Sequence, residues 1–162
     1  MKNTFLKIFA ALSIIFVILV LADVGNAQRR REARGKRLNK AQVEQIINRV
    51  EERVDNFDDH FDKSLDRSRL NGSKREDWLN KRASDLESAT DELRREFDRN
   101  DSWIENKDEV RKCLNIAADI DTTMRRQKLT RDTENIWARV RYELNTLADV
   151  YNLPKVGSGA YK

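Results

Sequence analysis

Between Gly35 and Pro154 the chain has a single glycine, Gly72, and no proline. Apolar residues recur every three or four positions over most of this length. Because the two residues that interrupt helices are nearly missing and the apolar spacing matches a helical turn, the sequence predicts an all-α fold. No stretch of useful length alternates apolar and polar residues, as a half-buried strand would.

Four helices are predicted, each beginning at a residue whose side chain can accept a hydrogen bond from the free N–H groups of a first turn. These N-caps are Asn39, Ser73, Ser102 and Thr130. The first three have a Gln or Glu three residues on, which completes a capping box. The four apolar faces expected to form the core are, in chain order, Val43, Ile46, Val50, Val54, Phe57, Phe61 and Leu65; Leu79, Ala83, Leu86, Thr90, Leu93 and Phe97; Trp103, Asn106, Val110, Cys113, Ala117, Ile120 and Met124; and Trp137, Val140, Leu144, Leu147 and Tyr151.

Short connections between these helices, such as Asn71-Gly72 and Asn100-Asp101, should make consecutive helices antiparallel. The sequence therefore predicts an up-down-up-down antiparallel four-helix bundle over residues 38–153. A three-helix bundle and a longer coiled coil in a dimer are the structural alternatives. Residues 154–162 are expected to be a flexible tail, because Pro154 and the sequence Gly157-Ser158-Gly159 end helical order.

The N-terminus reads as a secretory signal peptide, residues 1–27. Lys2 and Lys7 supply positive charge, Ile8–Ala22 is an apolar run, and Gly25 and Ala27 form a small-x-small cleavage site. Cleavage is expected after Ala27, which places the protein in the periplasm or elsewhere in the cell envelope. The alternative is an uncleaved membrane anchor, but an apolar run of about 15 residues is shorter than the roughly 20 that cross a bilayer as a helix.

Charge is concentrated in a basic arm, residues 28–37, which is expected to be disordered. Residues 38–162 carry 24 basic and 26 acidic side chains, so the bundle itself is nearly neutral and no specific nucleic-acid binding is predicted. The arm would bind an anionic lipid surface or envelope polymer, or else serve as a solvated spacer. Its basic residues are Arg29, Arg30, Arg31, Arg34, Lys36 and Arg37.

Residues that could carry chemistry are few. His60 is the only histidine, and Phe57 stands where a Glu-x-x-His di-iron motif would need glutamate. Cys113 is the only cysteine and lies on a predicted core face, so it should pack as a small apolar residue. No enzymatic activity, cofactor or metal is therefore predicted. An acidic run on the first helix fits a solvated, salt-bridged face better than a calcium site: Glu51, Glu52, Asp55, Asp58, Asp59 and Asp62.

An apolar cluster is expected at one end of the bundle. Trp78 and Trp137 lie near the starts of the second and fourth helices, which an antiparallel bundle brings together, and Leu65 and Met124 arrive there from the other two helices. Trp103 should lie at the opposite end. Such a cluster could hold an apolar ligand, or it could be ordinary core packing that closes the bundle end.

Three segments, Ser64–Asp77, Ser88–Asp91 and Leu144–Tyr151, resemble a group of exported bacterial helical proteins of uncharacterised function. The similarity covers about residues 38–154; it implies an envelope location and no particular activity. A weaker likeness is to small periplasmic chaperones marked by Leu-Thr-x-x-Gln, which Leu38–Gln42 approaches.

The sequence thus predicts a non-enzymatic, exported helical bundle of the bacterial envelope that acts by binding or as a structural element. Its partner would be an envelope protein or another envelope component, or a second copy of the chain. The alternatives are a periplasmic chaperone-like protein, which needs an exposed apolar surface, and a small-ligand carrier, which needs a cavity inside the bundle.

Overall fold

The computed structural model describes residues 38–127 and 129–161, and this part of the chain is helical with no strand. The four long helices are α2 (Lys40–Asp66), α3 (Lys74–Arg99), α4 (Lys107–Arg126) and α5 (Arg131–Tyr151). A short 3-10 helix, η1 (Trp103–Asn106), precedes α4. The prediction of an all-α, four-helix fold is confirmed. The predicted signal peptide and the basic arm lie outside the described residues.

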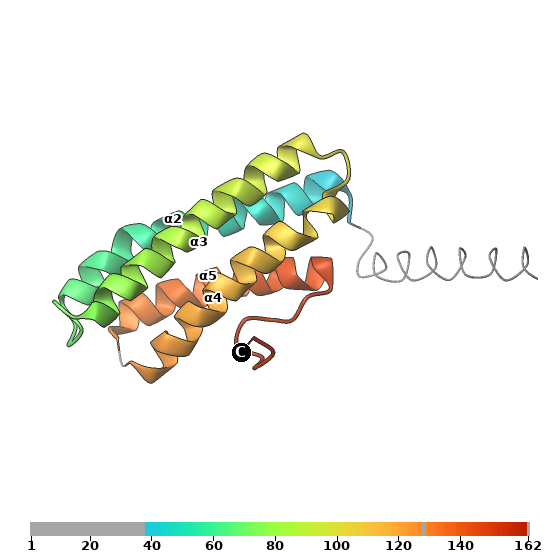
Figure 1. Ribbon diagram of the computed structural model, residues 1–162. Helices are drawn as coiled ribbons and strands as arrows, with labels where there is room; N and C mark the ends of the chain where they lie inside the picture. Colours follow the sequence, from blue (N-terminus) through green and yellow to red (C-terminus); the bar gives the residue numbers. More distant parts are fainter. Residues whose placement is uncertain (1–37, 128, 162) are drawn as a thin grey trace, which may run out of the picture. The chain divides into compact units, whose positions relative to one another are not determined.

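Each helix packs against the next one along the chain, and α2 also packs against α5, so the four helices enclose one core (Figure 1). Figure 1 shows the chain reversing direction at each of the three connections. The starts of α3 and α5 therefore lie at the same end of the group as the last turns of α2 and α4. Within residues 38–127 and 129–161, no helix combines the length and hydropathy needed to cross a membrane.

The apolar faces predicted from spacing form the core. Every residue of these faces is buried except Trp103, which is partly buried against the core. The structure adds Ile47, Ala89, Leu114 and Ala148 to the buried set, all adjacent to the predicted faces. Asn106 is fully buried, and neither polar atom of its side chain has a hydrogen-bond partner in the described part of the chain.

Three of the four predicted N-caps are confirmed. Asn39 and Gln42 form a capping box, and the side chains of Ser73 and Thr130 accept hydrogen bonds from backbone N–H groups of the first turns they precede. The capping box predicted for Ser73 is incomplete, because the Glu76 side chain accepts from the N–H of Gly72 instead of that of Ser73. The prediction for Ser102 is wrong, since its side chain makes no capping bond. The chain enters α4 through the 3-10 turn η1, so the residue before that turn has no α-helical first turn to cap.

Ser73→Ala is expected to lower the free energy of unfolding by about 0.5–2 kcal/mol, because the backbone N–H of Glu76 loses its partner. Ser102→Ala is the matched control and should change stability by less than about 0.5 kcal/mol. Urea unfolding followed by circular dichroism measures both. Equal losses in the two variants would contradict the difference in capping.

The C-terminal segment differs from the flexible tail expected from its sequence. Val156 is 4% exposed; its N–H donates to Asn145 Oδ1 at 2.7 Å, and its carbonyl accepts from Asn145 Nδ2 at 3.4 Å. Lys155 pairs with Asp149 at 2.8 Å. Asn152 ends α5 in the left-handed conformation. Burial of Val156 and the hydrogen bonds of the Asn145 amide then hold the segment 154–161 against the bundle.

Candidate functional site

Asp121 on α4 is a buried carboxylate, with a side chain 4% exposed. Its Oδ1 accepts hydrogen bonds from Trp137 Nε1 at 3.0 Å and from Arg141 at 2.9 Å. Its Oδ2 pairs with Arg125 Nε at 2.8 Å. Both carboxylate oxygens are therefore engaged, as a buried charge requires.

Helical spacing explains why these groups meet. Arg125 follows Asp121 by one turn on α4, and Trp137 and Arg141 are one turn apart on α5, so both pairs share a helix face. Trp137 is 3% exposed and its ring lies 5.0 Å from that of Phe57 on α2. The Asp121 group thus connects the α4–α5 contact to the aromatic core.

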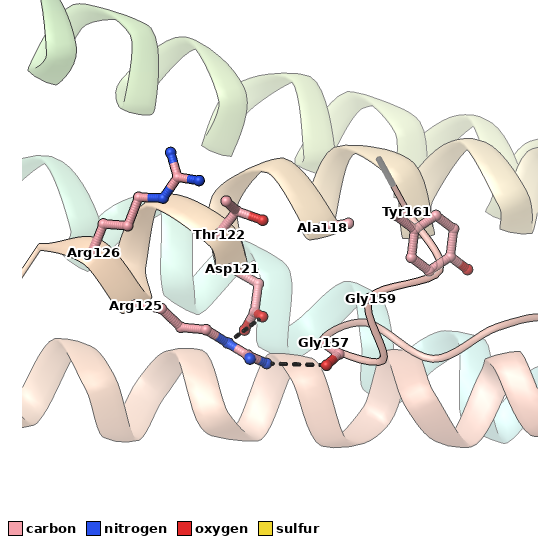
Figure 2. A pocket seen from close by; sticks show the side chains of 8 residues that line it. All are labelled: Ala118, Asp121, Thr122, Arg125, Arg126, Gly157, Gly159 and Tyr161. Atoms are coloured by element: carbon pink, nitrogen blue, oxygen red, sulfur yellow. Dashed lines mark hydrogen bonds and ion pairs between the residues drawn. The ribbon is translucent and has the colours of Figure 1, made fainter.

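Beside Asp121 lies a surface hollow of about 260 Å³ between the last turns of α4 and the C-terminal segment (Figure 2). In Figure 2 the side chain of Arg125 extends toward Gly157, whereas that of Arg126 extends in a different direction. The hollow is lined by Ala118, Asp121, Thr122, Arg125, Arg126, Gly157, Gly159 and Tyr161.

The backbone conformation of the C-terminal segment favours glycine at one position beside α4. Gly157 has φ of 88°, and a Cβ there would overlap the guanidinium of Arg125. Arg125 also donates to the carbonyl of Gly157 at 3.4 Å, and the Tyr161 hydroxyl donates to the Pro154 carbonyl. The segment is therefore closed on itself as well as attached to the bundle, and the Tyr161 ring is held at the wall of the hollow.

A second hollow, of about 580 Å³, adjoins the first on the α3 side of α4. The two share Ala118, Thr122, Arg126 and Tyr161, so they form one groove along the outer face of α4. Its remaining lining is Trp78, Asn115, Asp119 and Thr123.

The four residues predicted to form an apolar end cluster have different surroundings. Leu65, Met124 and Trp137 are buried in the core, so these three belong to its packing. Trp78 is only partly buried: it lines the outer groove, with the guanidinium carbon of Arg82 5.6 Å from its ring centre.

The other candidate residues offer little reactive chemistry. His60 is exposed, with Nδ1 2.8 Å from the carbonyl of Asn56. Cys113 is buried, as predicted, and burial raises the pKa of its thiol to about 12, which keeps it protonated at neutral pH. No group of three His, Cys, Asp or Glu side chains within the described residues could hold a metal ion.

Acidic residues on α2 face the acidic side of α3. The pKa values of Asp55 and Asp58 are raised, first by partial burial and then by neighbouring carboxylates. The pKa of Glu87 on α3 is raised in the same way, first by burial and then by neighbouring carboxylates, of which Asp58 has the largest effect. None of these three carboxylates forms an ion pair with a described residue, so the salt-bridged face predicted for the acidic run is wrong at these positions; from that run, Glu52 is paired, with Arg53 at 3.8 Å.

Sequence reasoning missed Asp121, the arginines around it and the C-terminal wall of the groove. A signal for Asp121 was available: it lies beside Ile120 on the core side of α4, where an unpaired charge would be costly. The groove had no comparable signal, because Pro154 and two glycines predict disorder rather than a wall. The predicted basic arm, from Arg29 to Arg37, lies outside the described residues.

No protein-family model matches the chain, and no similar protein is found among curated proteins or solved structures. The resemblance to exported bacterial helical proteins stays a prediction.

Proposed function

We propose that this chain is an exported, non-enzymatic binding module of the bacterial cell envelope, built as an up-down-up-down bundle behind a cleaved signal peptide. It binds at the outer groove of α4 rather than inside the bundle. The observation that carries the proposal is the contrast between a filled interior and an open, charged outer groove.

The filled interior argues against a ligand carrier that uses the bundle core. Core side chains from all four helices, such as Phe57, Leu86, Leu114 and Leu144, are at most 1% exposed. A chaperone-like role has less support because it needs a broad apolar surface. The large apolar side chains most exposed in the described residues are Ile104 and Tyr142, on separate elements.

The non-enzymatic part of the proposal depends on the state of the reactive groups. The Cys113 thiol is sealed and protonated, and His60 is on the surface with a backbone carbonyl as its neighbour. The buried carboxylate, Asp121, has both oxygens in hydrogen bonds to donors of this chain. Neither Cys113 nor Asp121 is therefore free to act as a nucleophile or general base, and His60 forms no hydrogen bond with a described side chain that it could activate.

The experiment is native mass spectrometry of the tagged protein purified from its own cell envelope. The wild type should carry a bound molecule or partner that Thr122→Trp removes, because the new side chain would fill the middle of the groove from an exposed position. Ser84→Trp, at an exposed position on α3, is the matched control and should retain it. Absence of any bound species, or one that survives Thr122→Trp, would contradict the proposal.

A separate prediction concerns the basic arm. Deleting residues 29–37 should abolish salt-sensitive binding to anionic vesicles, because residues 38–162 are net acidic and each lost positive charge is worth about 1 kcal/mol near such a surface. Vesicle co-sedimentation at low and high salt measures the effect. Equal binding of both chains would show that the arm is only a spacer.

A further inference from the structure

The outer groove of α4 carries an uneven distribution of charge. The two carboxylates that line it are both paired: Asp121 with Arg125 and Arg141, and Asp119 with Arg82 at 3.2 Å. Of the two arginines that line the groove, Arg126 makes no ion pair with any described residue. Arginines thus outnumber carboxylates in and around the groove, and the free one is in the lining itself.

Arg126 is placed to act on more than one side of the groove. Its side chain lines both hollows over α4 and also a third, which Ser68, Leu70 and Leu129 border. Because it is exposed, it can orient toward a ligand without breaking an existing contact. Arg125 has no such freedom, since Asp121 and the Gly157 carbonyl hold it.

Two aromatic side chains, Tyr161 and Trp78, also line the groove. Ala118, Thr122 and Arg126 follow one another at four-residue intervals, which places the first and last about 12 Å apart along α4. Tyr161 lies toward the Ala118 end in Figure 2, whereas Trp78, near the start of α3, lies beside the last turns of α4 and lines the same hollow as Tyr161. The floor between them is formed by the small side chains of Ala118 and Thr122.

We propose that the outer groove of α4 binds a small organic anion, with its carboxylate or phosphate at Arg126 and a flat ring against Tyr161 and Trp78. The inference rests on the proposed function and names the ligand class of that site. Arginine suits either head group, because its planar fork matches both oxyanions. The Tyr161 ring supplies a preformed wall, since its hydroxyl is tied to Pro154.

Isothermal titration calorimetry on the exported chain tests the proposal with four probes: 2-naphthyl phosphate, 2-naphthoate, 2-naphthol and inorganic phosphate. At least one naphthyl anion should bind ten-fold more tightly than both naphthol and inorganic phosphate. The tighter of the two anions identifies the head group, and either identity supports the site. Failure of both anions to bind, or equal affinity for naphthol, would overturn it.

Variants separate the contact to the anionic head group from the contact to the ring. Arg126→Gln should weaken binding of the anion about ten-fold and leave naphthol unchanged, whereas Tyr161→Ala should weaken both. Arg131→Gln, at an exposed position on α5, is the matched control and should have no effect. An anion affinity that Arg126→Gln leaves unchanged would overturn the assignment.

The outcomes also distinguish failure of this inference from failure of the proposed function. A native ligand that Thr122→Trp displaces, together with no binding of either naphthyl anion, would overturn the ligand class and leave the binding module standing. Tight, Arg126-dependent binding of an anion, with no groove-dependent species in the envelope, would support the site and contradict the proposed function.

Discussion

Trp137→Ala is expected to lower the free energy of unfolding by about 3–5 kcal/mol, the largest effect of any single change considered for this chain. The indole is 3% exposed, its ring lies 5.0 Å from that of Phe57, and its Nε1 donates to the buried Asp121. Alanine would leave a cavity in the core and remove one of the donors to a buried carboxylate. Urea unfolding monitored by circular dichroism measures the loss.

Trp78→Ala is the control for this prediction, because Trp78 is near the same end of the bundle but only partly buried. It should cost clearly less, since water replaces part of the lost contact. A loss below about 1 kcal/mol for Trp137→Ala, combined with binding of an apolar probe to the wild type and not to the variant, would instead indicate a ligand pocket within the core.

The core was predictable from the sequence because helix faces repeat at a fixed period. Val43, Val54 and Leu65 recur on α2 so that one side of the helix is apolar from end to end. With glycine and proline nearly missing, no other secondary structure competes with this pattern. Burial of Cys113 followed from the same reasoning, since its place on the α4 face predicts its surroundings.

The start of α4 shows where local patterns mislead. Ser102 and Glu105 have the spacing of a capping box, but the chain makes a 3-10 turn there, which places Trp103 against Tyr151 with ring centres 5.4 Å apart. Packing of the two aromatic rings and the bond from the Tyr151 hydroxyl to the Trp103 carbonyl accompany this turn. Contacts between residues 48 positions apart are not visible in a four-residue motif.

The groove could not be predicted from the sequence either, and the reason is similar. Its walls come from α3, α4 and the C-terminal segment, and the last of these reads as a disordered tail. Val156 is the apolar residue that anchors it, and its partner Asn145 lies on the preceding helix with no distinguishing spacing. Position 157 looks like a linker glycine in sequence, whereas in the fold it allows close approach to Arg125.

Asp121→Ala is expected to destabilise the protein by about 2–4 kcal/mol, less than the full cost of breaking a buried ion pair. Arg125 and Arg141, which would lose their ion pairs, have side chains 55% and 36% exposed, so water can solvate much of their charge. Most of the lost stability comes from Trp137 Nε1, because its buried N–H group is left without an acceptor. Asp119→Ala, which removes an exposed carboxylate two residues away, is the control and should cost less than about 1 kcal/mol.

A double-mutant cycle isolates the Trp137–Asp121 hydrogen bond from the surrounding ion pairs. Trp137→Phe removes the indole N–H and keeps an aromatic ring, so Asp121→Ala made in that background should cost about 1–2 kcal/mol less than in the wild type. Chemical unfolding of the four proteins gives the coupling free energy. If Asp121→Ala costs the same in both backgrounds, the two arginines, and not the indole, account for the stability that Asp121 contributes.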